Sequence, residues 1–260
     1  AKHPHVVVIV LDDVGYGDLR PWATNNTIIR TPNIDQLARA GVALDRHYSQ
    51  VRCSPSRAAL LTGRYPMRYG LQSYVLSPVK PYGLPVNEST MAQILKNAGY
   101  ATHMVGKWHL GFHTWPVTPT FRGFDTWFGI SEGEADHYNY TVDLGKVKDV
   151  NVLFWQARPN CGDGCIDKVE RQQFSSSLWT ERAVRVVEEH DNRSVPLFLY
   201  LCYTAPHAPC EAAPEPYASP YSHVKDPKRR VYAEMLSATD GGIGNVTAAL
   251  SKRGMLDDTI

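Results

Sequence analysis

The interpretation of this chain starts from Cys53-Ser-Pro-Ser-Arg-Ala-Ala-Leu-Leu-Thr-Gly-Arg64. Pro55 suits the first turn of a helix and Gly63 suits the position beyond its end, so this stretch predicts a helix capped by Ser54. Cys53 is then expected at the positive end of the helix dipole, where an anion is favoured. Arg57 follows four residues later on the same side of the helix and can point toward the same anion. A buried structural cysteine does not ordinarily occupy such a position.

Outside this stretch, apolar strands alternate with helical segments. Two runs, at 6–11 and 197–201, are continuously apolar, as expected for strands buried on both faces of a parallel sheet. The alternation predicts an α/β fold, with a mainly parallel sheet flanked by helices in one domain. A third, shorter strand is expected at 102–105, and helices are expected at 31–40 (capped by Thr31 and ended by Gly41), 88–98, 175–189 and 231–252, the last weakened by Gly241, Gly242 and Gly244.

Composition excludes several classes of protein. The 260 residues are 43% hydrophobic and 20% charged, which is ordinary for a folded globular chain. A formal charge of +1 gives no electrostatic reason to bind nucleic acid or a membrane surface. No apolar stretch reaches the roughly 18 residues that a membrane-spanning helix needs. The last residues, Thr259-Ile260, are typical of the start of a strand, so we expect a fragment of a longer protein.

Paired carboxylates follow the first predicted strand. Asp12-Asp13 comes directly after the run 6–11, and ligand sites of open α/β sheets lie at the carboxyl ends of strands. Two carboxylates at that position suit a hard divalent cation. The alternative is that one aspartate caps a turn while the other is solvated.

Basic residues follow the other two strands. If the chain after 102–105 stays extended, Lys107 and His109 project to one face, with Trp108 opposite. A cation beside an imidazole suits an anionic oxygen and proton transfer, although a surface lysine and a packed histidine are the alternative. His207 lies beyond the strand 197–201. We therefore expect the aspartate, cysteine, lysine and histidine groups to converge on one rim of the sheet.

Sequons and cysteines bear on the compartment. Five N-x-[ST] triplets favour passage through a secretory pathway, where such acceptors lie on the surface: Asn25, Asn87, Asn139, Asn192 and Asn245. Cys161 and Cys165 flank a short glycine-rich loop and could form a disulfide, as could Cys202 and Cys210. Each of these four cysteines could equally be a free thiol.

The stretch C-S-P-S-R followed by L-T-G-R resembles the signature of the sulfatase family, in which the cysteine is oxidised to formylglycine. The segments L-D-D-V-G-Y-G-D, G-K-W-H-L-G and R-G-F-D-T-W-F-G are also similar to sulfatases. Within the family, T-H-M-V-G-K-W-H-L-G and P-L-F-L-Y-L most resemble the N-acetylgalactosamine-4-sulfatases of the arylsulfatase B type. The resemblance implies an alkaline-phosphatase-like fold, with residues 1–260 as the amino-terminal part of a single catalytic domain that is incomplete at its carboxyl end.

The resemblance also implies roles for individual residues. It makes Cys53 the formylglycine precursor, bound with Asp12 and Asp13 to one calcium ion. Arg57 and His109 would act on the formylglycine group and the sulfate. Lys107 and His207 would bind the sulfate.

The expected partners are a sulfated glycan or aryl sulfate and the formylglycine-generating enzyme, and the expected address is lysosomal or secreted. The expected reaction is hydrolysis of sulfate esters. The expected substrate is the 4-sulfate of N-acetylgalactosamine in dermatan or chondroitin sulfate. The family places a further Asp-Asn calcium pair and a lysine beyond Ile260. We therefore expect this polypeptide alone to bind calcium weakly and to be inactive or nearly so.

Three other hypotheses remain open at this point. The chain could be a truncated, non-catalytic relative, a phosphate or phosphonate ester hydrolase of the same superfamily, or a cysteine hydrolase that uses the thiolate of Cys53. One basic cluster could attract a polyanionic glycan but is more typical of a solvated loop: Lys225, Lys228, Arg229 and Arg230.

Overall fold

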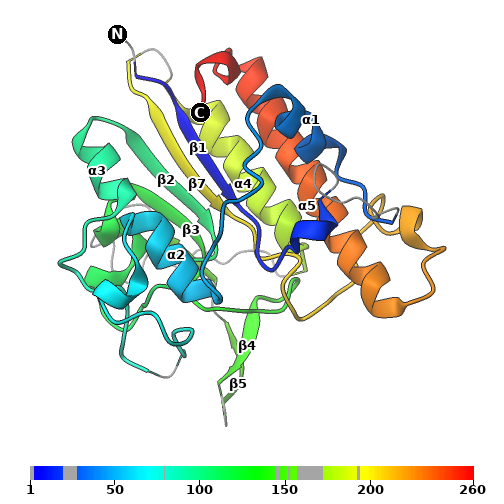
Figure 1. Cartoon of the computed structure of the whole chain (residues 1–260), viewed down its shortest axis with the longest axis horizontal. Helices are drawn as coiled ribbons and strands as arrows, with labels where there is room; N and C mark the ends of the chain where they lie inside the picture. Colours follow the sequence, from blue (N-terminus) through cyan, green and yellow to red (C-terminus); the bar gives the residue numbers. More distant parts are fainter. Residues whose placement is uncertain are drawn as a thin grey trace.

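The protein folds as helices packed on both faces of one sheet (Figure 1). The computed structural model describes residues 3–19, 28–78, 80–144, 147–151, 153–156, 172–191 and 194–260. The main sheet has the order β1 (Val6–Val10), β7 (Leu197–Cys202), β2 (Ala101–Gly106), β3 (Thr126–Ile130) and β6 (Leu153–Gln156). Its first four strands are parallel, and β6 pairs antiparallel with β3. The predicted α/β fold with a mainly parallel sheet is therefore confirmed.

Strand β7 lies inside the sheet, between β1 and β2, and all six of its residues are buried. Its side chains alternate between the two faces, as the pleat requires. Leu197, Leu199 and Leu201 belong to one hydrophobic cluster, whereas Phe198 and Tyr200 belong to another. A continuous apolar run suits this position because both faces of the strand are covered.

Two sets of helices cover the sheet (Figure 1). The helices α4 (Ser175–Glu189) and α5 (Pro227–Lys252) pack on the face of Leu199, and α1 (Pro32–Ala40) lies against α5. The helices α2 (Cys53–Thr62) and α3 (Met91–Asn97) cover the other face. A separate two-stranded ribbon, β4 (Thr141–Leu144) with β5 (Val147–Asn151), projects away from this body.

Helix α1 has the predicted bounds, with Thr31 in the capping position and Gly41 after its end, but its capping bond and the starts of other helices differ from those predicted. Thr31 makes no capping bond to α1; instead the Asp240 carboxylate of α5 accepts hydrogen bonds from the backbone N–H groups of Asn33 and Ile34, at 3.2 and 2.8 Å. Helix α3 begins three residues late because Thr90 and Gln93 form a capping box.

Helix α2 begins at Cys53 rather than after Ser54. Arg52 holds the capping position, and the Ser54 hydroxyl accepts the backbone N–H of Leu76 at 3.0 Å instead. Ser54 therefore links the loop that contains Leu76 to helix α2 and does not cap the helix. Gly63 ends the helix with φ +65°, as predicted.

The long helix α5 runs unbroken through its three glycines. A Cβ on Gly242 would lie 2.2 Å from Oγ1 of Thr180 and 2.6 Å from Oη of Tyr203. The missing side chain therefore lets α5 approach α4 and β7 closely.

The helix also begins earlier than predicted, because Asp226 caps the N–H groups of Lys228 and Arg229. Most of the expected basic loop is thus the first turn of α5. Within that turn, the Arg229 guanidinium pairs with Asp18 at 2.5 Å.

The last residues lie beside β1. Thr259 forms a parallel bridge with His5, and the N–H of Ile260 donates to the carbonyl of His5 at 2.9 Å. The strand expected at Thr259-Ile260 therefore starts on the outer edge of the sheet. Among the described residues, none of the helices is both long enough and apolar enough to cross a membrane.

Candidate active site

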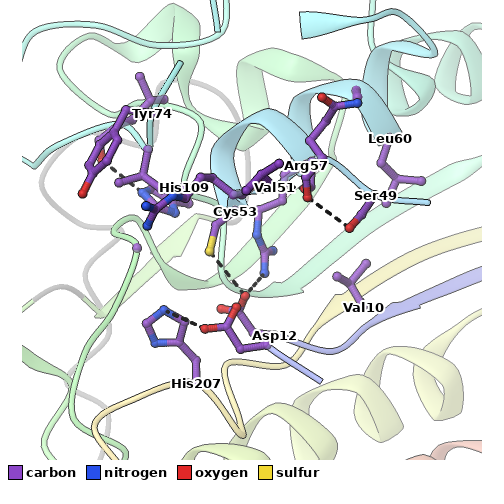
Figure 2. A pocket seen from close by; sticks show the side chains of 18 of the residues that line it. Val10, Asp12, Ser49, Val51, Cys53, Arg57, Leu60, Tyr74, His109 and His207 are labelled. Carbon is purple, nitrogen blue, oxygen red and sulfur yellow. Dashed lines mark hydrogen bonds and ion pairs between the residues drawn. The ribbon is translucent and has the colours of Figure 1, made fainter. Parts of the chain in front are cut away.

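The functional side chains meet at one edge of the sheet because its central strands are parallel. Asp12 follows β1, Lys107 follows β2, and His207 follows β7 by a short loop. Parallel strands present their carboxyl ends at the same edge, where ligands of open α/β sheets bind. Helix α2 brings Cys53 and Arg57 to this edge, and Figure 2 shows the side chains of Cys53, Arg57 and His207 gathered around Asp12. The predicted convergence on one rim is confirmed.

Asp12 lies at the centre of these contacts. Its Oδ2 pairs with the ammonium of Lys107 at 2.5 Å, and its Oδ1 lies 3.5 Å from Nη2 of Arg57. The Cys53 thiol donates to the same Oδ1 at 3.6 Å. Burial opposes ionisation of this carboxyl, but the charges of Arg57 and Lys107 outweigh burial and lower the pKa of Asp12 to about 2. Asp12 is therefore a buried carboxylate held between two cations.

Arg57 is fixed as well as charged. Its Nη1 donates to the backbone carbonyl of Lys107 at 2.9 Å, and its side chain is buried. Burial would lower the pKa of Arg57, but the carboxylate of Asp12 outweighs burial and raises it. The guanidinium is thus a permanent positive charge one turn into α2.

Cys53 occupies the first position of α2 and is partly exposed to a cavity. Ligand atoms of Asp12, Cys53 and His207 all lie within 4.8 Å of one another. A hydrogen bond with Cys53 is the main cause that raises the pKa of His207, against the effect of burial. The His207 ring is held on its other side by the Ala208 carbonyl, 2.6 Å from Nδ1.

Asp13 differs from its neighbour. Its side chain is 62% exposed, its φ is +61°, and its Oδ2 lies 3.6 Å from Nε2 of His207. The carboxylates of Asp12 and Asp13 therefore lie on the buried and the open side of the same site.

The segment after β2 is not extended, because His109 has φ +56°. The alternation that would place Lys107 and His109 on one face therefore does not apply. Lys107 is buried against Asp12, whereas His109 lines the cavity, with Nε2 lying 3.0 Å from the carbonyl of Leu76. Burial, followed by the charge of Lys107, lowers the pKa of His109 to about 3, and its Nδ1 has no hydrogen-bond partner among the described residues.

The cavity has a volume of about 1240 Å³ and is lined by residues of β1, α2 and the loops that follow β2, β3 and β7. Its lining includes two acids that the sequence reasoning missed, Glu132 and Glu134. Glu132 follows β3, is 2% exposed and lines the wall, and burial raises its pKa to about 7. The signal was available, because the strand-like run T-W-F-G-I ends immediately before Ser131-Glu132.

The disulfide prediction for Cys202 and Cys210 is wrong in this structure, where both are free thiols. Cys202 is the last residue of β7 and points into the core shared with α2, whereas Cys210 is exposed on a loop. Cys161 and Cys165 lie outside the described residues.

Three of the five sequons can be located. Asn87, Asn139 and Asn245 are exposed, as an acceptor must be. Asn25 and Asn192 lie outside the described residues.

The donor set suits a hard cation only in part. Asp12 is ionised, Asp13 is open to solvent, and position 53 lies beside them. Calcium takes about six to eight oxygen ligands, so these residues fit one side of a coordination shell and leave the remainder to other groups.

This fold and this site define a family. The chain belongs to the sulfatase family, whose pattern matches residues 4–260. The family assignment and the alkaline-phosphatase-like fold made from the sequence are thereby confirmed.

Individual sulfatases resemble the chain over its whole length. Arylsulfatase J of Mus musculus is 38% identical over 259 residues, covering 100% of this chain and 42% of its own length. N-acetylgalactosamine-6-sulfatase of Mus musculus is 30% identical, and the match covers 98% of this chain and 48% of that sulfatase. A crystal structure described as Ps i-CgsB superposes with a TM-score of 0.87 at 31% identity, covering 99% of this chain and 57% of that one. The chain thus spans about half the length of the curated relatives it matches.

Proposed function

We propose that the protein containing this chain hydrolyses sulfate esters, using a formylglycine made from Cys53 and one calcium ion. One observation carries the proposal. The cysteine of the C-S-P-S-R motif opens α2 inside a cavity, in contact with an ionised Asp12 and with His207, while Arg57 lies one turn further on. Domain boundaries of 1–260, as part of one catalytic domain, belong to the same proposal.

Two groups would supply chemistry that the unmodified side chains lack. A hydrated aldehyde at position 53 offers one hydroxyl to attack sulfur and a second whose collapse releases the sulfate. Calcium held by Asp12, Asp13 and the side chain at position 53 would add positive charge where the sulfate oxygens lie.

The residues of the chain prepare the site for an anion. The helix N-terminus at Cys53 and the fixed charge of Arg57 favour a sulfate at that position. Lys107 keeps Asp12 ionised and so preserves a carboxylate for the cation. We assign the contact with the bound sulfate to Arg57 and, once the cation shares Asp12, to Lys107.

The two histidines have different roles. His207 lies beside position 53, so its imidazole can carry a proton there and deliver it to the departing alcohol oxygen. The lowered pKa of His109 keeps it neutral, and its unpartnered Nδ1 can accept a hydrogen bond from the hydroxyls at position 53.

We propose sulfated galactosamine glycans as the substrate class. Within this class, the substrate we favour is the 4-sulfate of N-acetylgalactosamine in dermatan or chondroitin sulfate. A relative named N-acetylgalactosamine-6-sulfatase supports the sugar but leaves the position to be tested. A lysosomal or secreted address and maturation by the formylglycine-generating enzyme complete the proposal, and the exposed sequons at Asn87, Asn139 and Asn245 support it.

The test begins with the mass of the tryptic peptide Cys53–Arg57, from the longer protein produced together with the formylglycine-generating enzyme. We expect an aldehyde or its hydrate at position 53, and turnover of an aryl sulfate that exceeds turnover of the matched aryl phosphate. Cys53→Ala should abolish turnover, whereas Cys210→Ala removes an exposed thiol as the control. A free thiol at position 53, with the modifying enzyme active on a second substrate, would contradict the proposal.

A further inference from the structure

The wall of the cavity contains a buried acid that pairs with no cation among the described residues. Glu132 follows β3, and two backbone bonds fix its loop to the site: the N–H of Trp108 to the carbonyl of Ile130, at 2.9 Å, and the N–H of His109 to that of Ser131, at 3.2 Å. The Glu132 side chain lines the cavity although the residue is only 2% exposed. The backbone next to Glu132 is thus fixed beside the site.

The surroundings of Glu132 differ from those of Asp12. Within the part of the chain that the structure describes, no lysine, arginine or histidine nitrogen pairs with the Glu132 carboxyl, and its contact is the Ser131 hydroxyl at 3.5 Å. A buried carboxyl without a cation is costly, since desolvation is not repaid by an opposite charge. An uncompensated acid in a cavity therefore calls for a partner from the ligand.

A second polar atom nearby is also unpartnered. Gly133, the next residue, packs so closely on His109 that a Cβ there would lie 2.4 Å from Cε1 of the imidazole. The Nδ1 of that ring, in a residue 4% exposed, has no hydrogen-bond partner among the described residues. Among the described residues, the β2 loop thus presents an unpartnered nitrogen to the cavity, and the β3 loop presents a carboxyl whose contact is the Ser131 hydroxyl.

We propose that Glu132 is a specificity-determining residue of this site, which contacts a hydroxyl or amide of the sugar ring that bears the sulfate and disfavours a second sulfate or a carboxylate there. The inference rests on the proposed sulfatase function and deepens it by naming the substrate class. That class is a sugar with one sulfate and neutral neighbouring substituents.

The selectivity follows from the charges that line the cavity. Arg57 and the start of α2 attract one anion, whereas a second anion beside Glu132 meets a like charge in a partly desolvated site. A neutral hydroxyl or amide supplies the missing hydrogen bond instead. A site built to hydrogen-bond a substituent rejects substrates that leave its polar groups unpaired.

The experiment compares Glu132→Gln and Glu132→Leu in the full protein, with the aldehyde at position 53 verified. The substrates are N-acetylgalactosamine 4-sulfate and its 4,6-disulfate, assayed at pH 8 so that the Glu132 carboxyl is charged. Glu189→Gln, on the exposed end of α4, matches the charge change away from the cavity. Thermal unfolding of each variant establishes that it is folded.

We expect the wild-type protein to prefer the monosulfate by tenfold or more in kcat/KM. Glu132→Gln should reduce that preference at least fivefold with kcat on the monosulfate within threefold, because the amide keeps a hydrogen bond and loses the charge. Glu132→Leu should raise KM for the monosulfate about tenfold. Glu189→Gln should leave the preference unchanged.

An unchanged preference in both folded Glu132 variants would overturn the inference. A wild-type protein that carries the aldehyde and hydrolyses neither sugar sulfate would instead refute the proposed function. In that case the dissociation constants of the two sugars decide the inference: a monosulfate preference lost in Glu132→Gln supports it, and equal constants in wild type and variant overturn it.

Discussion

Two buried carboxyls in one cavity are shifted in opposite directions by their neighbours. Asp12 has Lys107 and Arg57 within reach, which lower its pKa to about 2 despite burial. Among the described residues, Glu132 has the Ser131 hydroxyl as its contact and no cation, so burial raises its pKa to about 7. The difference between the stable anion at Asp12 and the acid at Glu132 that titrates near neutrality therefore lies in the cations close to each carboxyl.

Removing Lys107, the ion-pair partner of Asp12, should strongly destabilise the fold. Lys107→Met leaves a buried carboxylate with one cation fewer, and we expect the free energy of unfolding at pH 7 to fall by about 3–5 kcal/mol. Urea denaturation in the presence of a chelator measures this loss.

The control is Lys96→Met, which removes an exposed lysine paired with Asp125 at 2.8 Å. That pair is open to water, so its loss should cost less than about 1 kcal/mol. Equal effects of the two substitutions would show that burial of the Asp12 pair contributes nothing.

Glu132 should make stability depend on pH. A carboxyl whose pKa rises from 4.5 unfolded to about 7 folded stabilises the fold fully below pH 4.5, and this stabilisation is lost as pH rises through 7. Glu132→Gln does not titrate, so its stability relative to wild type should increase between pH 4 and pH 8. We expect an increase of about 3 kcal/mol, measured by urea denaturation at both pH values. A difference that stays constant with pH would contradict the raised pKa.

Local sequence identified some of these residues and not others. Asp12 and His207 were predictable because each follows a long apolar strand, and Cys53 because proline and glycine bracket its helix. Glu132 was missed because its strand is short and its acid looks like any loop residue. The pairing of Lys107 with Asp12 could not be predicted either, since it joins residues 95 positions apart.

Among the secondary-structure elements, α5 shows how packing overrides helix propensity. Glycine is an unfavourable helix residue, by about 1 kcal/mol relative to alanine, and the sequence therefore suggested a weak helix. The structure places Gly242 where α5 meets Thr180 and Tyr203, and the helix continues through 26 residues. The propensity cost is offset by the close approach of α5 to α4.

Gly242→Ala should therefore destabilise the protein although it favours the isolated helix. The added methyl group would lie 2.2 Å from Oγ1 of Thr180, so one helix must move. We expect a net loss of at least about 1 kcal/mol, since overpacking a core typically costs 1–3 kcal/mol. Thermal unfolding measures it, with Ser251→Ala on the exposed last turn of α5 as the control. A stabilised Gly242→Ala variant would mean that helix propensity dominates at this position.

The elements predicted well are those with a long periodic or apolar pattern. The strands at 6–11 and 197–201 and the helix at 175–189 match β1, β7 and α4 to within one residue. The strands β3 and β6 were missed, because five- and four-residue runs containing glycine or glutamine give little signal. The capping of α1 by Asp240 depends on a contact over 200 residues away in sequence, which no local pattern contains.

At the scale of the whole molecule, the site depends on the order of strands in the sheet. Strand β7 lies between β1 and β2, so it brings His207 beside Asp12 across almost 200 positions of sequence. The described residues nevertheless provide only a part of what the proposed chemistry needs. In the proposed site, Asp12, Asp13 and position 53 would supply three calcium ligands where about six to eight are usual.

We therefore expect this 260-residue chain alone to bind calcium weakly, with a dissociation constant on the order of 10⁻⁴ M or higher. Calorimetric titration measures the affinity, and Asp13→Asn should weaken the binding further. For the same reason we expect little or no turnover of an aryl sulfate by this chain. Micromolar calcium binding would mean that these residues, with water, already make a sufficient shell.

The burial of α2 determines whether modification of Cys53 can follow folding or must precede it. Cys53 and Ser56 are partly exposed, but Ser54, Pro55 and Arg57 of the motif are buried once the helix is packed. A modifying enzyme that reads these side chains could not reach them in the folded state. The proposed conversion of Cys53 must therefore occur on the newly made chain, in competition with folding. We therefore expect a variant that folds faster to have less time for this conversion, and so to carry less formylglycine at position 53 although it is better folded.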